Sequence, residues 1–103
     1  MDKKQLEEEI VARIKTVYDP EIPVDVYELG LIYDIDISED NDVVITMTLT
    51  TPSCPVAESL PQEVEDTVKE IEQVKNVSIN LTFDPPWGQD MMSEEAMLEL
   101  GFL

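Results

Sequence analysis

Two strand patterns with a helical pattern between them are the feature that most limits the fold. Residues 43–49 and 77–83 each alternate in side-chain character, which predicts two half-buried strands. The residues between them carry apolar side chains at helical spacing: Val56, Leu60, Val64, Val68 and Ile71. A strand–helix–strand connection is a crossover, which places its two strands parallel within one sheet. The sequence therefore predicts a sheet that contains a parallel pair.

A third strand precedes this unit. Tyr33, Ile35 and Ile37 alternate with aspartates, and the turn 38–42 that follows them is short, which predicts an antiparallel hairpin with residues 43–49. Together with a helix at each end of the chain, the elements run in the order α-β-β-α-β-α. We expect an α+β two-layer sandwich, with a small mixed three-stranded sheet, helices packed on one face of it, and a single domain over residues 1–103.

The helix ends are also predictable. The first helix should end before Asp19-Pro20, since proline disfavours helix at the residue before it. Pro61 interrupts the middle helix, which predicts either a kink or a restart capped by Ser59, with Gln62 completing a capping box. Ser93 is a good cap for the last helix. The apolar stripe expected along the first helix is Leu6, Ile10, Ile14 and Val17.

Segments of irregular pattern fall at the same end of this predicted sheet. Residues 19–30 precede the first strand, residues 50–55 follow the second, and residues 84–87 follow the third. Because the first strand runs opposite to the other two, all three segments should meet at one end of the sheet. Ligand sites in parallel α/β arrangements favour the carboxyl ends of strands, so we expect the functional site there.

Cys54 is the only cysteine of the chain, and it stands between a strand pattern and a helical pattern. Pro55 after it suits the first position of a helix, which would make Cys54 the capping residue. A thiol at a helix N-terminus tends towards thiolate, the form that binds metals. The alternative is that Cys54 is a small buried hydrophobic residue with no chemical role.

The candidate site takes its polar groups from the segments around Cys54. A thiolate near carboxylates can hold a metal transiently, but a stable cluster requires about four thiolates. Each residue also has a structural explanation: the aspartate before Pro20 as a helix stop, the threonines as strand formers, Trp87 as a core plug. The candidates are Cys54, Thr50, Thr51, Asp19 and Glu21, with Ser53, Asp84 and Trp87 beside them.

Charge and composition exclude several classes of function. The chain has 6 Lys and Arg against 24 Asp and Glu, a net charge of −18, which argues against nucleic acid and anionic membranes as partners. Histidine is absent, so a Ser-His-Asp triad, a Cys-His pair and a histidine zinc site are excluded. With no leader or membrane span expected, the sequence favours the cytoplasm. A sheet with two open edges and a single cysteine per chain also suggests a homodimer.

The motifs together resemble a known family. Asp19-Pro20-Glu21-Ile22, then Thr48 to Pro55 with Cys54, then Asp84-Pro85-Pro86-Trp87, are similar to the signature of the metal–sulfur cluster assembly domain family, with its SufT-type and PaaD-like members. The resemblance covers nearly the whole chain. It implies that Cys54, Asp19, Glu21, Thr50 and Thr51 are the family's motif residues. PaaD-like members carry a cysteine-rich tail, so the end at Leu103 favours the SufT-type branch.

The resemblance implies an accessory, non-enzymatic factor that helps assemble or deliver iron–sulfur clusters to client apoproteins. Its partners would be the iron–sulfur assembly machinery and those clients. No cofactor would be bound stably; a cluster or iron would be held transiently, with Cys54 as the metal ligand. A second hypothesis is an interaction adaptor with a structural cysteine, as in a PaaD-like subunit. A third, a thiol-dependent enzyme, is disfavoured because Cys54 lacks an ordinary general base.

Overall fold

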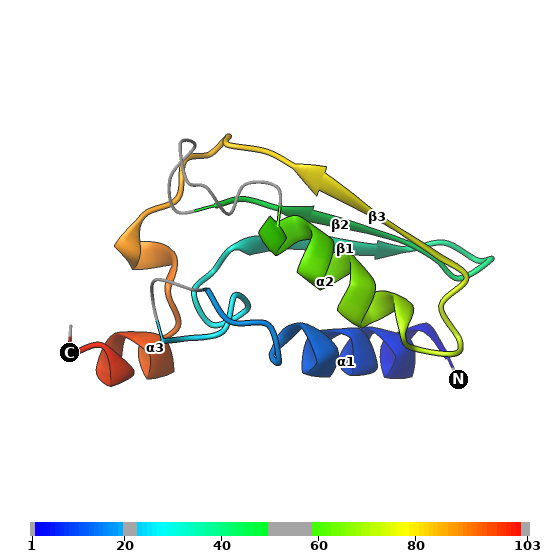
Figure 1. The fold of residues 1–103 in the computed structure, drawn as a ribbon, viewed down its shortest axis with the longest axis horizontal. Coiled ribbons are helices and arrows are strands. Elements are labelled where there is room, and N and C mark those ends of the chain that lie inside the picture. The colour runs from blue at the N-terminus through cyan, green and yellow to red at the C-terminus, as the bar shows by residue number, and fades with distance from the viewer. Residues whose placement is uncertain (1, 20–22, 50–58, 102–103) are drawn as a thin grey trace.

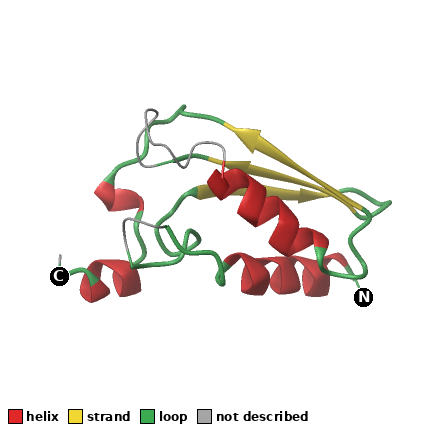
Figure 2. Ribbon diagram, in the orientation of Figure 1, coloured by secondary structure: helices red, strands yellow, loops and turns green. Residues whose placement is uncertain are grey.

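The computed structural model describes residues 2–19, 23–49 and 59–101. Its elements follow the predicted order, with one addition, a short 3₁₀ helix near the C-terminus. They are α1 (Lys3–Ile14), β1 (Ile32–Ile37), β2 (Asp42–Met47), α2 (Ser59–Lys69), β3 (Asn76–Leu81), η2 (Gln89–Met91) and α3 (Glu94–Glu99). Figure 2 shows the helices and strands separated into different parts of the molecule. The α+β fold predicted from the sequence is confirmed.

The sheet has the predicted mixed topology. Its strand order is β1-β2-β3, with β1 antiparallel to β2 and β2 parallel to β3. Ile45 in the central strand lies opposite Ile35 on one side and Ile79 on the other, so the three side chains share one face. The ladder between β1 and β2 has an irregularity between Ile32 and Asp34. β2 ends at Met47, earlier than the expected Leu49, although Leu49 is still buried.

Both long helices cover the same face of the sheet (Figure 1). α2 packs against β3 and against α1, and the core between the layers is made by the apolar stripes of all these elements. The opposite face of the sheet carries the alternate residues and is open to solvent. Its exposed members are Asp34, Asp36, Val44, Ser78 and Asn80. None of the helices in the described ranges has both the length and the hydropathy needed to cross a bilayer.

The helix ends differ from prediction in two places. α1 ends at Ile14, before Val17, because the chain tightens into a turn in which the Val17 N–H donates to the Ile14 carbonyl at 3.0 Å. Val17 nevertheless stays in the core. α2 is described from Ser59 to Lys69 and continues through Pro61 without a break. Residues 50–58 lie outside the described ranges, so the predicted kink at Pro61 stays a prediction.

The predicted capping box at the start of α2 is also wrong. Ser59 is described as helical, and the Gln62 side chain is used elsewhere. Its amide donates forward to Glu65 at 3.1 Å and to Asp66 at 2.9 Å. By contrast, Ser93 caps α3 as predicted, with its hydroxyl accepting from the Ala96 N–H at 3.1 Å.

Candidate functional site

Segments from before β1 and after β3 meet at one end of the sheet, as the sequence predicts. The Trp87 indole Nε1 donates to the Leu29 carbonyl at 2.7 Å, and the Tyr33 hydroxyl donates to the Pro85 carbonyl at 2.8 Å. The Ser93 N–H donates to the Glu28 carbonyl at 2.9 Å. The remaining segment of the predicted site, residues 50–55, lies outside the described residues.

The turn 25–30 is built by one carboxylate and one glycine. The Asp25 carboxylate accepts from the N–H groups of Tyr27 and Glu28 at 3.1 and 3.0 Å, which closes the turn in the way aspartate favours. Gly30 follows with φ of 82°, in the left-handed region that glycine adopts readily. A Cβ on Gly30 would also collide with the Met91 carbonyl, so this position requires glycine for its conformation and for packing against η2.

Asp19 is the one of the five main candidates that the structure describes, and Asp84 and Trp87 beside them are described as well. Asp19 is only 6% exposed, although it follows Tyr18, which is 57% exposed. Its backbone N–H donates to the Val24 carbonyl at 3.4 Å, and Tyr18 forms a single antiparallel bridge with Asp25. These contacts hold Asp19 beside the turn that carries Gly30. The other predicted members, Cys54, Thr50, Thr51 and Glu21, lie outside the described residues.

The end of β2 is held on both sides as the chain leaves the sheet. The N–H of Thr48 donates to the Leu31 carbonyl at 2.8 Å, and the N–H of Thr82 donates to the Met47 carbonyl at 2.9 Å. Thr48 itself is completely buried. The chain therefore enters the segment that carries Cys54 from a rigid, buried position between the neighbours of β2.

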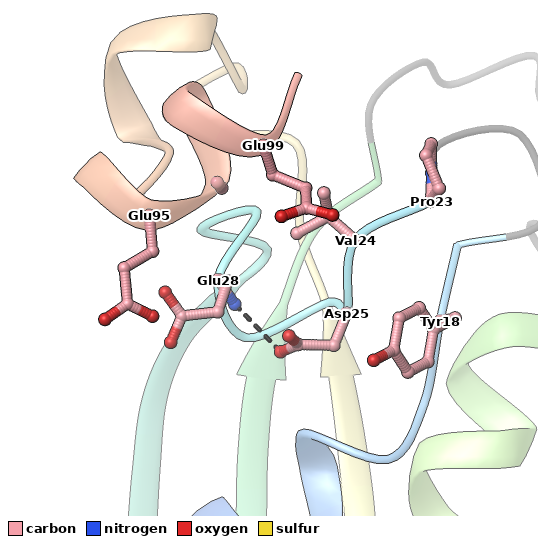
Figure 3. A pocket seen from close by; sticks show the side chains of 8 residues that line it. Tyr18, Pro23, Val24, Asp25, Glu28, Glu95 and Glu99 are labelled. Carbon is pink, nitrogen blue, oxygen red and sulfur yellow. Dashed lines mark hydrogen bonds between the residues drawn. The ribbon is translucent and has the colours of Figure 1, made fainter. Parts of the chain in front are cut away.

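Sequence reasoning missed an acidic cavity at this end of the molecule. The cavity is about 210 Å³ in volume, and it lies between α3 and the segment 18–28. Figure 3 shows the acidic side chains grouped around the hollow, with the Tyr18 ring at the far side from Glu95. The sequence shows two pairs of acidic residues, Asp25–Glu28 and Glu95–Glu99, spaced three and four residues apart. Whether the two pairs come together depends on how α3 packs, which the spacing does not reveal. The lining residues include Tyr18, Asp25, Glu28, Glu95 and Glu99.

The cavity is electrostatically negative, but the residues described around it do not form a chelating site. Lys15 partly neutralises it, with Nζ 3.4 Å from the Glu28 carboxylate and 5.4 Å from the centre of the Tyr27 ring. Among the residues that the structure describes, no three metal-ligating side chains come close enough to hold an ion together. The cavity is therefore suited to attract positive charge rather than to bind a metal with preformed geometry.

Comparison with known proteins decides the family. Residues 7–81 match the family model described as iron-sulfur cluster assembly protein. The chain belongs to this family. The matched stretch contains Asp19, Glu21, Thr50, Thr51 and Cys54, whereas Trp87 lies beyond it.

Individual relatives agree with the family assignment. The chain is 59% identical, over 96% of its length and 94% of the relative, to a protein of Porphyromonas gingivalis named Fe-S protein maturation auxiliary factor. It is 34% identical, over 82% of its length and 97% of the relative, to the Fe-S protein maturation auxiliary factor SufT of Staphylococcus aureus. The crystal structure of a domain of unknown function, DUF59, from Bacillus anthracis superposes with a TM-score of 0.90 at 35% identity, covering 97% of this chain and 95% of that one. The expected SufT-type resemblance is confirmed.

Proposed function

We propose that this protein is an accessory factor in the maturation of iron–sulfur proteins, and that it helps assemble or deliver clusters to client apoproteins. The observation that carries the proposal is the 59% identity, over nearly the full length of both chains, to a protein named Fe-S protein maturation auxiliary factor. Membership of the iron-sulfur cluster assembly family supports the same role. The cluster is cargo in this account, not a resident cofactor.

Cys54 supplies the chemistry in this proposal. It is the one soft, ionisable ligand in the sequence, and iron–sulfur clusters are held by cysteine thiolates. A single thiolate per chain is too few for a stable cluster, so the cluster or iron is held transiently and passed on. Asp19, Glu21, Thr50 and Thr51 shape the pocket around the thiol. The burial of Asp19 beside the turn 25–30 supports its place in this pocket.

The role is non-catalytic and cytoplasmic. Histidine is absent from the sequence, so Cys54 has no ordinary general base to make it the nucleophile of an acyl-transfer enzyme. In the cytoplasm, thiols are kept reduced, which a working free cysteine requires. The partners are the iron–sulfur assembly machinery and the client apoproteins, and a second copy of the chain would bring a second Cys54 to the cluster.

Complementation of a bacterial strain that lacks its own family member tests the proposal. Cys54→Ser should accumulate to the normal level, since serine is close in size to cysteine, yet leave iron–sulfur enzymes poorly active. Ser78→Ala, at an exposed position of β3 outside the candidate site, is the control and should restore activity. If Cys54→Ser restores the enzymes fully, Cys54 is not the working residue, and the protein acts as an adaptor with a structural cysteine.

A further inference from the structure

A groove runs between α1 and the open edge of β1. It contains cavities of about 210 Å³ and about 390 Å³, and both are lined by Glu7, Val11 and Tyr27. Residues 32–35 of β1, which include Asp34, form the other wall of the first cavity. The second cavity continues along α1 past Lys4 and Glu8. The groove thus combines apolar and aromatic side chains with acidic ones.

The edge of β1 that borders this groove has unpaired backbone groups. The Ser38 N–H donates to the Asp42 carbonyl at 2.9 Å, so Ser38 directs its backbone groups towards the neighbouring strand. The backbone N–H and C=O groups of successive residues point to alternate sides of a strand. Those of Asp36 therefore also point towards β2, while those of Ile35 and Ile37 point outwards. No strand in the described ranges pairs with β1 on that side. An extended chain can add to such an edge through main-chain hydrogen bonds.

The side chains on the two faces of β1 determine which side chains an added strand needs. Asp34 and Asp36 are exposed and alternate along β1 with Ile35, and both Asp34 and Ile35 line the first cavity. Residues directly opposite each other on neighbouring strands interact, and opposite charges stabilise the pair. An added strand would therefore place basic side chains beside Asp34 and Asp36, and apolar side chains in the groove beside Val11 and Tyr27.

We propose that the groove between α1 and β1 binds an extended segment of a partner protein in which Lys or Arg alternates with apolar residues. A second copy of this chain does not fit, because its own β1 would bring aspartates against Asp34 and Asp36, and each chain carries a charge of −18. This inference rests on the proposed function in that the partner is a client apoprotein.

The groove is placed to bring a partner close to the candidate site. Tyr27 belongs to the turn 25–30, and Tyr33 donates to the Pro85 carbonyl, so the residues that line the groove are bonded directly into the end of the sheet where the predicted site lies. A segment bound along β1 would hold the rest of its protein beside that end. Binding and cluster delivery would then be adjacent events on one molecule.

Binding of a synthetic peptide tests the groove without iron or sulfide. The probe is a short fluorescent peptide in which lysine alternates with valine, followed by anisotropy; the comparison peptide replaces lysine by glutamate. The lysine peptide should bind, and hydrogen exchange of the Ile35 and Ile37 amides should slow when it does. Asp34→Asn/Asp36→Asn should weaken binding roughly three- to tenfold, the effect of losing two opposite-charge pairs. Both substitutions are on the surface, so circular dichroism should stay unchanged.

The matched control is Glu63→Gln/Glu72→Gln, which removes the same amount of charge from exposed positions elsewhere. It should leave binding nearly unchanged. Three results would contradict binding in the groove. They are equal weakening by both double variants, no binding of the lysine peptide, and slowed exchange at Val77 and Ile79 of β3 in place of Ile35 and Ile37. Failure of this assay leaves the role of Cys54 untouched, whereas full complementation by Cys54→Ser overturns that role alone.

Discussion

The Trp87 indole nitrogen donates a 2.7 Å hydrogen bond to the backbone carbonyl of Leu29, which lies fifty-eight residues earlier in the chain. Leu29 is completely buried, and Trp87 is half-buried against the core. The bond joins the segment after β3 to the turn before β1. It is therefore one of the contacts that assemble the site end of the molecule from distant parts of the sequence.

Replacement of Trp87 by phenylalanine should measure this contact. Trp87→Phe keeps an aromatic ring but leaves the Leu29 carbonyl without its donor, which costs about 1–3 kcal/mol of unfolding free energy. For a domain of this size the thermal midpoint should fall by roughly 4 °C or more. Tyr18→Phe is the control: Tyr18 is 57% exposed, and its midpoint should barely change. Equal midpoints for Trp87→Phe and wild type would show that the bond contributes nothing.

Two glycines with the same φ allow backbone strain to be separated from packing. Gly30 and Gly101 both have φ of 82°, but a Cβ on Gly30 would lie 2.8 Å from the Met91 carbonyl carbon, while one on Gly101 would meet nothing within 4 Å. Gly101→Ala should cost about 1 kcal/mol from conformation alone. Gly30→Ala should cost clearly more, because η2 must also move. Chemical denaturation of both variants checks this, and similar losses would contradict the packing argument.

The fold was predictable because its local patterns and its topology agree. The alternation of Ile35 and Ile45 places both residues on the core face, and the crossover rule gives the parallel pairing of β2 with β3. The details that failed depend on context. The capping box predicted for Ser59 and Gln62 does not form, because the Gln62 amide donates to Glu65 and Asp66 instead.

The site was less predictable than the fold. The meeting of the segments that contain Leu29 and Trp87 followed from strand direction. The acidic cavity did not, because it depends on α3 docking against the turn 25–30, and a short helix with one buried residue, Ala96, gives little pattern to read. The predicted roles of Cys54, Thr50, Thr51 and Glu21 stay predictions, since these residues lie outside the described ranges.

Removal of single charges from α3 should have opposite effects at its two ends. Glu94 lies in the first turn, where the helix dipole favours a negative charge. Glu99 ends the helix, where the dipole disfavours it, and it lies four residues from Glu95 in the same cavity. Glu99→Gln should raise the unfolding free energy by about 0.5 kcal/mol at low salt, and Glu94→Gln should lower it by a similar amount. Equal stabilisation by both variants would mean that only net charge matters.

Asp19→Asn tests whether the buried carboxylate serves the site. Asparagine keeps the size and turn-forming ability of aspartate but loses the charge. In the complementation strain, we expect normal protein levels and a loss of client-enzyme activity smaller than that of Cys54→Ser. Asp40→Asn, in the exposed hairpin turn, is the control and should behave as wild type. If Asp19→Asn lowers only the amount of protein, Asp19 is structural.

Reactivation of a client enzyme in a purified system tests the central claim most directly. An apo iron–sulfur enzyme is mixed anaerobically with iron, sulfide and a thiol reductant, and the recovery of its activity is followed with and without this protein. The wild-type protein and Ser78→Ala should accelerate recovery severalfold, and Cys54→Ser should give the rate seen with no protein added. Equal acceleration by Cys54→Ser and wild type, or no acceleration by wild type, would contradict delivery through Cys54.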